Sequence, residues 1–440
     1  MAGEFLVGIT GLVALVGLIA VRVPIAYAMT AVGLAGIWML SGPAILLSQM
    51  KSLAYGTFSN YDLSVVPLFI LMGHLASRAN LSYGLFRAAN AWLGHFRGGV
   101  AMAAIAACAG FGAVCGSSLA TASTMGKVAL PELKRYNYSS ALATGTLAAG
   151  GTLGILIPPS IVLVVYSVIV EANIIQMFSA AMFPSLLAVL FFVATIWLYT
   201  LFVPDAGPKG SVVTRKELVS ATLGAVPVTL VFGIMLGGMY AGFYTATAAA
   251  SIGVFLVLAY GFAAKLLTPE DILEAILATA RNAGMIYLIV LGAELLEIFM
   301  SRGGVPQAAA QVMLESGLPP YFLLLLVLIA LIVLGMFMDS LSIVLLTLPF
   351  FWPVISELNF GLTENETKLW FGILALIVVE LGLITPPVGM NVFVINAMAK
   401  DVPMMETFKG AFPFFSVELL RVAIILAFPA LVLFFPAWIG

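Results

Sequence analysis

Apolar residues occur along this chain in long continuous runs, separated by short segments that carry most of the polar positions. About twenty consecutive apolar residues are enough for a helix to cross a membrane. The runs do not alternate between apolar and polar positions, which favours helical spans over a transmembrane barrel. The pattern predicts about ten spans, near residues 5–21, 24–40, 63–79, 139–170, 178–203, 218–239, 242–262, 284–300, 369–398 and 411–436.

Two further apolar runs, 99–131 and 320–355, are each too long for one span and are interrupted near the middle. The first is interrupted by GAVCGSS at 112–118 and the second by MDSLS at 338–342. Irregular backbone at membrane depth is tolerated only inside protein or beside a water-filled cavity. We therefore expect two re-entrant hairpins with polar tips.

A Pro-Pro pair breaks two of the predicted spans in the same way. The segment LGILIPPSIVLVVYS at 153–167 has a counterpart, LGLITPPVGMNVFVI, at 381–395, displaced by 228 residues from Pro158 to Pro386. Adjacent prolines remove two amide donors and clash with the preceding turn, so a helix cannot continue through them. Paired broken helices in corresponding halves of a membrane protein indicate a transporter binding site. Independent kinks remain the alternative to such a repeat.

Composition and charge place the chain among polytopic α-helical membrane proteins. The residues are 62% hydrophobic and only 9% charged, whereas soluble domains carry about 25% charged residues. The net charge of −2 argues against a nucleic-acid partner. The positive-inside rule favours both termini outside, because fifteen of the eighteen Lys and Arg then lie in the cytoplasm and only Lys51, Arg302 and Lys368 outside. The acidic Glu4 and the missing cleavage signal predict that 5–21 is a retained span.

This orientation places the two hairpins on opposite faces, and each precedes a broken helix, so the sequence predicts an inverted-topology repeat. Two amphipathic stretches, near 82–97 and 269–282, are expected to lie flat on the cytoplasmic side as arms, or as plain surface helices. The second begins with Thr268 at the cap and Pro269 at the first helical position. The predicted division is a scaffold at 1–98, a first transport repeat at 99–203, a central scaffold at 204–319 and a second transport repeat at 320–440.

The second hairpin tip carries the clearest candidate chemistry. Charges within a membrane are costly and usually functional, and Asp339 follows a long apolar run together with Ser340 and Ser342. A carboxylate with two hydroxyls offers hard oxygen ligands suited to Na⁺. Alternatively, Asp339 caps a half-helix, which is compatible with shaping the same site.

The first tip has no carboxylate but carries Gly116, Ser117, Ser118 and Thr121, whose hydroxyls are candidate ligands for an ion or for a substrate. Small residues also serve plain helix packing in membranes, which is the alternative here.

At the breaks, Thr385, Asn391 and Ser160 are candidate substrate ligands beside Ser117 and Ser118. Freed backbone carbonyls beside the prolines would add Na⁺ ligands, and half-helix N-termini would favour an anionic substrate. The complete predicted Na⁺ set is Gly116, Ser117, Ile157, Pro158, Asp339, Ser340, Ser342, Thr385, Pro386 and Met390.

Other polar groups are open to plainer interpretations. His74 is either a proton relay or a hydrogen-bonded packing residue, and Glu380 is either a proton carrier or a structural acceptor. Glu418 and Arg421 are three residues apart and are expected to neutralise each other. The chain has no G-x-x-x-x-G-K-[ST], H-E-x-x-H or G-x-S-x-G motif, so no enzymatic or ATP-driven activity is predicted.

Four motifs in this order resemble the large membrane subunit, DctM-type, of tripartite ATP-independent periplasmic (TRAP) transporters. They are Gly116-Ser117-Ser118, LGILIPPS at 153–160, Met338-Asp339 with TLP at 347–349, and GLITPPVGMN at 382–391. The resemblance covers essentially the whole chain. Cys115, Ser342 and Ser167 depart from the residues usual at those positions in the family.

The resemblance implies an elevator-type secondary transporter driven by a Na⁺ gradient in a bacterial or archaeal cytoplasmic membrane, with no organic cofactor. It implies a carboxylate substrate, such as a C4-dicarboxylate, received from a periplasmic substrate-binding protein. It also implies a small four-helix membrane subunit, expected here as a separate polypeptide. Ser117, Ser118 and the Pro158 break would form one half of the ion and substrate sites, and Asp339, Ser340, Thr385 and the Pro386 break the other. The alternative is a stand-alone ion-coupled anion transporter or antiporter of the same hairpin architecture.

Overall fold

The computed structural model describes residues 2–315 and 317–439 of the chain. Residues 1, 316 and 440, which the predicted division includes, lie outside the described residues. Throughout these two ranges the regular secondary structure is helical, and no strand occurs in them. The predicted all-α class is confirmed.

The N-terminal part contains a long bent helix that the hydrophobic pattern underestimates. Its helices are α1 (Ala2–Ala20), α2 (Ile25–Ser59), the 3₁₀ turn η1 (Asp62–Ser64), α3 (Val65–Arg78) and α4 (Leu81–Leu93). The span predicted at 24–40 continues to Ser59 because Gly42 adopts φ +79° and Pro43 then occupies the first turn of the resumed helix. The arm expected at 82–97 is the separate helix α4, bent by 65° from the preceding one.

The next part contains the first predicted hairpin and broken helix. Its helices are α5 (Gly99–Cys115), α6 (Ser118–Arg135), α7 (Ser140–Leu156), α8 (Ile161–Ile169) and α9 (Ile174–Phe202). The interruptions lie at 116–117 and 157–160, inside the predicted segments, and α8 departs from α7 by 44°. From Leu142 onwards every residue of α7 is buried. Its many Gly, Ala and Thr residues allow α5, α6 and α18 to pack closely around it.

The central part corrects the prediction of a second flat arm. Its helices are the 3₁₀ turn η2 (Pro204–Ala206), α10 (Arg215–Tyr240), α11 (Ala246–Ala263), α12 (Pro269–Arg302) and α13 (Val305–Glu315). The stretch 269–282, expected to lie separately, is the first part of the continuous 34-residue helix α12. No proline interrupts the chain between Asn282 and the predicted span at 284–300, so one helix contains both. The predicted cap is present, because Thr268 and Asp271 form a capping box.

The C-terminal part repeats the pattern of a hairpin followed by a broken helix. Its helices are α14 (Pro320–Gly335), α15 (Ser340–Ser356), α16 (Glu364–Gly382), α17 (Met390–Met398), α18 (Met404–Ala427) and α19 (Ala430–Ile439). Helices α14 to α17 contain 16, 17, 19 and 9 residues, against 17, 18, 17 and 9 for α5 to α8. The span predicted at 411–436 begins earlier, at Met404, and is interrupted at Phe428, because Pro429 lacks the amide that would continue α18.

Among the described residues, seven helices are long and apolar enough to cross a membrane, or nine if each of two bent pairs is one span. Each of these nine overlaps one of the ten predicted spans, although α2 and α12 are longer than predicted and the first bent pair also includes most of the predicted arm. The tenth, 369–398, corresponds to α16 and α17, and α16 carries four charged residues along its 19 positions.

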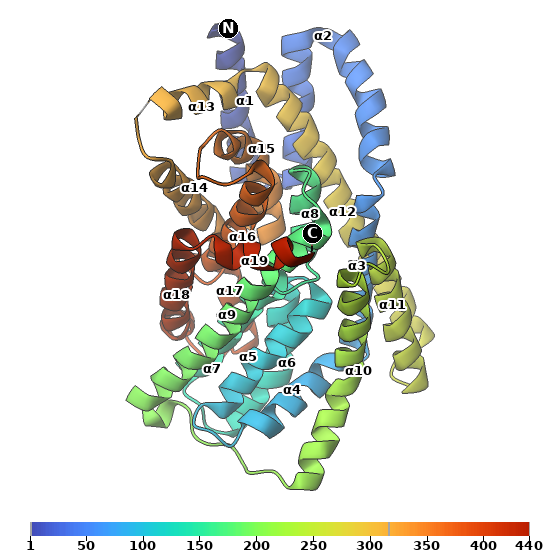
Figure 1. Cartoon of the computed structure of the whole chain (residues 1–440), viewed down its shortest axis with the longest axis vertical. Coiled ribbons are helices and arrows are strands. Elements are labelled where there is room, and N and C mark those ends of the chain that lie inside the picture. Colours follow the sequence, from blue (N-terminus) through green and yellow to red (C-terminus); the bar gives the residue numbers. More distant parts are fainter. Residues whose placement is uncertain (1, 316, 440) are drawn as a thin grey trace.

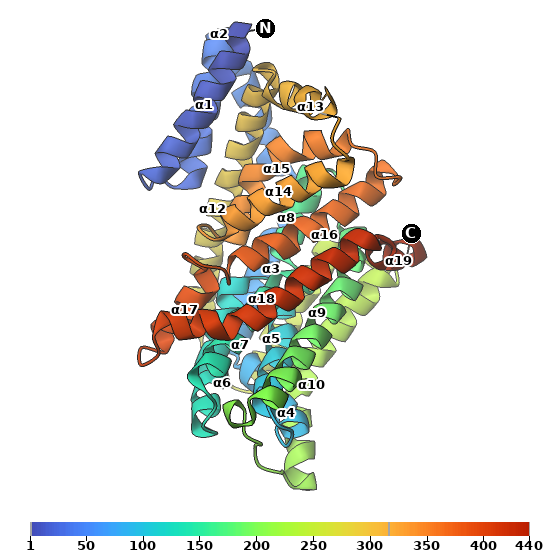
Figure 2. The ribbon, with the colours of Figure 1, turned by 90° about the vertical axis from the view of Figure 1, so that its left-hand side faces the viewer.

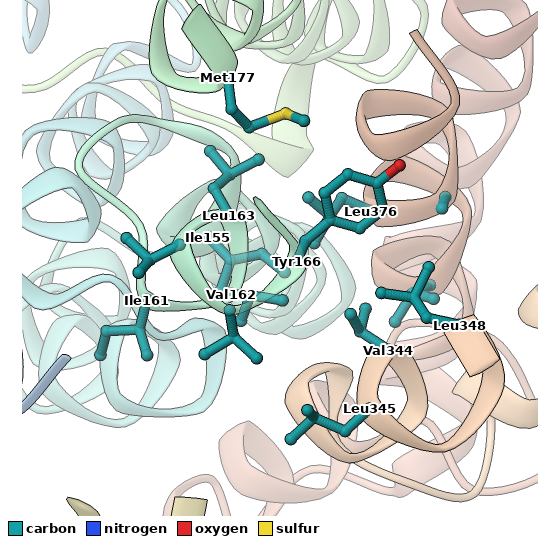
Figure 3. Packing of buried hydrophobic residues seen from close by; sticks show 14 of the residues in the cluster. Ile155, Ile161, Val162, Leu163, Tyr166, Met177, Val344, Leu345, Leu348 and Leu376 are labelled. Atoms are coloured by element: carbon teal, nitrogen blue, oxygen red, sulfur yellow. The ribbon is translucent and has the colours of Figure 1, made fainter. Parts of the chain in front are cut away.

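Figures 1 and 2 show that α1 and α2 lie at one end of the long axis and α4 and α10 towards the other. In Figure 2 the helices α14, α15, α16 and α18 run side by side between these ends. Helix α12 packs against both α2 and α3, and α3 also packs against α11 and α4 against α10. The first broken helix and the second hairpin share an apolar core. Figure 3 shows Val162 and Tyr166 of α8 opposite Val344 and Leu348 of α15, all four buried.

Candidate functional site

The tips of the two hairpins meet at one cavity of about 390 Å³. Ligand sites in proteins have volumes of this order. Helices α3 and α12 form one wall of the cavity, and the N-terminal end of α8 contributes to the lining between the tips. Its polar lining comprises His74, Ser77, Ser117, Ser118, Ser123, Thr124, Asn282, Asp339, Ser340 and Ser342, with Cys115 and Gly116 beside them.

The first tip is a tight reversal between α5 and α6 beside the first Pro-Pro break. Gly116 adopts φ +62°, and a Cβ on this residue would lie 3.2 Å from the backbone nitrogen of Ile161. Ser117 is the cap of α6, and its hydroxyl accepts a long hydrogen bond from the amide of Ala120 (3.5 Å). The tip therefore presents a helix N-terminus and two serines to the cavity.

The second tip is capped by Asp339. Its carboxylate accepts hydrogen bonds from the amide (3.2 Å) and the hydroxyl (2.5 Å) of Ser342. The capping role weighed for Asp339 is therefore present, and the same side chain also lines the cavity. This tip rests on the second break, because the amide of Gly389 donates to the carbonyl of Met336 (3.2 Å).

Glu380 joins the two tips. The hydroxyl of Ser118 donates to its Oε2 (2.7 Å), and the hydroxyl of Ser340 donates to its Oε1. The carboxylate is buried near the end of α16, and its two hydrogen bonds are those that the structural-acceptor alternative for Glu380 expects. Sequence reasoning missed these partners, although a lone carboxylate in an apolar run one turn before a break was the available signal.

The predicted residues at the breaks lie outside the lining of this cavity. They are Ile157, Pro158, Ser160, Thr385, Pro386, Met390 and Asn391. Both Pro-Pro bonds are cis. Ser160 caps α8 by accepting a hydrogen bond from the amide of Leu163 (3.4 Å). The hydroxyl of Thr385, just beyond α16, donates to the carbonyl of Leu381 near the end of that helix (2.6 Å).

Asn391 connects the second broken helix to the first. Its side-chain amide donates to the carbonyl of Ala148 on α7 (3.2 Å), while its buried Oδ1 has no hydrogen-bond partner in the described part of the chain. At the end of α6, Lys134 donates to Asp401 in the loop after α17 (2.5 Å). This hydrogen bond lowers the pKa of the Asp401 carboxyl from its ordinary value. Hydrogen bonds thus connect the first hairpin and broken helix to the second broken helix at more than one place.

The remaining polar groups make the contacts that the plainer interpretations expect. His74 is hydrogen-bonded to the side-chain amide of Asn282 (3.2 Å) at the wall of the cavity. Arg421 is buried and pairs with Glu418 on its own helix, and it also donates to the carbonyl of Pro184 (2.9 Å). The predicted neutralisation of these two charges is therefore confirmed.

Electrostatically, the cavity suits a small cation together with an anion. Asp339 is its one carboxylate among the described residues, and the lining there contains no Lys or Arg. Hydroxyls, the N-termini of α6, α8 and α15, and the side chains of His74 and Asn282 supply the other polar groups. In the described part of the chain, no three His, Cys, Asp or Glu side chains cluster in a way that could hold a metal ion. A weakly bound ion such as Na⁺, held by hydroxyls, carbonyls and one carboxylate, needs no such cluster.

A second cavity of about 610 Å³ lies further along the same elements. Asp62, Glu171, Glu294 and Glu297 line it, together with the end of α8 and Pro349 of α15. Helices α8, α12 and α15 thus contribute to both cavities. Buried apolar residues of α8 and α15 pack against each other along the intervening stretch (Figure 3).

Comparison with known proteins identifies the family. The profile described as "Tripartite ATP-independent periplasmic transporter, DctM component" matches residues 12–431. The C4-dicarboxylate TRAP transporter large permease protein DctM of Pseudomonas aeruginosa is 33% identical over 410 residues, covering 91% of this chain and 94% of that protein. The sialic acid TRAP transporter large permease protein SiaM of Vibrio cholerae is 28% identical, covering 96% of each.

A solved structure, the YdaH transporter of Alcanivorax borkumensis, superimposes with a TM-score of 0.65 over 90% of each chain. At 13% identity this likeness concerns the fold alone. The relatives are transporter permeases and not enzymes. The chain therefore belongs to the DctM family, the large membrane component of tripartite ATP-independent periplasmic transporters.

Proposed function

We propose that this chain imports a small organic acid, a C4-dicarboxylate or a similar carboxylate, in symport with Na⁺. The cavity between the hairpin tips carries this proposal. Asp339 and the serines offer oxygen ligands for Na⁺, and no Lys or Arg among the described lining residues is available to neutralise a carboxylate. Bound Na⁺ and the helix N-termini would supply the positive charge that an organic anion needs there.

The transport cycle proposed is an elevator movement of an inverted repeat. The moving part comprises 99–203 and 320–440, and the scaffold comprises 1–98 and 204–319. Two cavities along the boundary between these parts support the proposal, since α3 and α12 of the scaffold face α8 and α15 of the repeats. Sliding of the apolar α8–α15 unit past α12 would expose the site to one side and then to the other.

The proposed setting is the cytoplasmic membrane of a bacterium or archaeon, with both termini on the periplasmic side. The proposed partners are a separate small four-helix membrane subunit and a periplasmic protein that delivers the substrate. The names of relatives for C4-dicarboxylates and for sialic acid support an organic acid as the cargo.

Reconstitution of the chain with its small subunit in liposomes tests the proposal. With substrate-loaded binding protein outside, an inward Na⁺ gradient should drive uptake, whereas a choline gradient should not. Equal uptake in both gradients would contradict Na⁺ coupling. Equal uptake without the binding protein or small subunit would instead support the alternative, a stand-alone anion transporter of the same architecture.

A further inference from the structure

Ser118 and Ser340 occupy equivalent positions in the two hairpins. Each follows the capping residue at the tip, Ser117 in one hairpin and Asp339 in the other, and each is the first residue of its helix. Their hydroxyls converge on Glu380, one on each carboxylate oxygen. Residues far apart in sequence are thereby joined at one point.

The contact is well placed to control the distance between the tips. Glu380 is 1% exposed, Ser118 3% and Ser340 5%, so these hydrogen bonds are shielded from bulk water. A buried carboxyl group that loses its hydrogen-bond partners pays the full cost of its desolvation. Separating either tip from the carboxylate therefore carries a penalty.

The carboxylate itself is held on a rigid element. Helix α16 is buried on all sides from Leu369 to its end at Gly382, and Gly382 packs directly against Gly335 at the end of α14. The corresponding position in the first half is Thr152, whose hydroxyl donates to the carbonyl of Ala149 in its own helix (2.6 Å). Within the described residues, Glu380 of the second half therefore makes this connection, and Thr152 of the first half does not.

We propose that Glu380 is a positioning residue that holds the two hairpin tips at a fixed separation. It acts through Ser118 and Ser340, and so keeps Ser117 and Asp339 directed at the same cavity. Its effect on ion binding rests on the proposed Na⁺ site, but its mechanical role does not.

Native Cys115 provides a probe of this role. It lies at the first tip beside the cavity, and Cys108, buried on the same helix, is an internal reference. Maleimide labelling of the purified protein in choline chloride, followed by peptide mass spectrometry, reports the two thiols separately. Ser340→Ala, on the opposite hairpin, should accelerate labelling of Cys115 by about tenfold, the factor for a hydrogen bond worth about 1.4 kcal/mol. Labelling of Cys108 should not change.

Variants of Glu380 separate positioning from misfolding. Glu380→Leu should reproduce the acceleration, and adding Ser340→Ala to it should have no further effect. Glu380→Gln keeps the length of the side chain and can still form hydrogen bonds with both hydroxyls, so Cys115 should be labelled as slowly as in the wild type. Glu294→Gln is the matched control, because this carboxylate accepts from Thr57 (2.5 Å) away from both tips. An unchanged Cys115 rate in Ser340→Ala and in Glu380→Leu would overturn the proposal.

Thermal unfolding across Na⁺ concentrations separates this inference from the proposed function. If Glu380→Leu shows both faster labelling of Cys115 and a raised half-saturating Na⁺ concentration, the result supports the positioning role and the Na⁺ site together. Absence of Na⁺ stabilisation in the wild type would contradict the Na⁺ site, and the labelling result alone would then decide the positioning role.

Discussion

Replacing Asp339 by asparagine separates two roles that this side chain combines at the second hairpin tip. The carboxylate caps α15 through the amide and hydroxyl of Ser342, at 3.2 and 2.5 Å, and it also lines the cavity. Asparagine caps a helix about as well as aspartate, whereas alanine loses about 1 kcal/mol at such a position. Asparagine therefore removes the charge but retains the cap.

The expected effect of the charge is larger than that of the cap. A unit charge about 4 Å from a cation contributes about 4 kcal/mol at an effective dielectric constant of 20. Water in the cavity weakens this attraction. We therefore expect the half-saturating Na⁺ concentration to rise at least tenfold, which corresponds to a loss of about 1.4 kcal/mol in binding free energy. Stability without Na⁺ should fall by a few tenths of a kcal/mol in Asp339→Asn and by about 1 kcal/mol in Asp339→Ala.

The assay is thermal unfolding of the purified variants across Na⁺ concentrations, with choline holding the ionic strength constant. A ligand that binds only the folded state raises its stability by RT ln(1 + [L]/Kd), so the midpoint curve reports the affinity. Wild-type Na⁺ dependence in Asp339→Asn would refute an ion-binding role and leave Asp339 as a cap alone.

Three further substitutions test other parts of the account. Ser117→Ala should raise the Na⁺ concentration for half-maximal stabilisation while changing stability in choline little, because its capping bond is long; an unchanged concentration would remove the hydroxyl from the ion site. Gly410→Ala should destabilise the fold by about 1–3 kcal/mol or more, because a Cβ there would overlap the carbonyl of Ala141 where α18 crosses α7; unaltered unfolding in denaturant would contradict this close crossing. Arg421→Met should cost about 3–5 kcal/mol by leaving Glu418 buried and unpaired, and Glu418→Leu in the same chain should recover most of that loss.

Features that depend on neighbouring residues could be predicted from the sequence. The prolines at 158 and 386 break their helices wherever they are packed, and Asp339 caps α15 through a residue only three positions away. For the same reason the predicted tips, 112–118 and 338–342, overlap the observed interruptions at 116–117 and 336–339.

Features that depend on packing between distant segments could not be predicted from the sequence. The partners of Glu380 include Ser118, 262 residues away, and Asn391 finds its acceptor on Ala148 across 243 residues. Hydropathy also could not show that α2 resumes beyond Pro43 or that α12 is continuous, because a polar or bent segment is stabilised there by helices packed beside it. The sequence thus assigns the residues at the breaks to the same site as the tips, whereas the structure places them outside the lining of the cavity.

Direct binding of radioactive Na⁺ to the purified wild-type protein tests the central claim with no partner or substrate present. We expect saturable binding that unlabelled Na⁺ displaces and that equal concentrations of K⁺ or choline do not, with Asp339→Asn weakening it at least tenfold. Binding that is absent, or that K⁺ displaces as readily as Na⁺, would contradict a Na⁺ site at the hairpin tips.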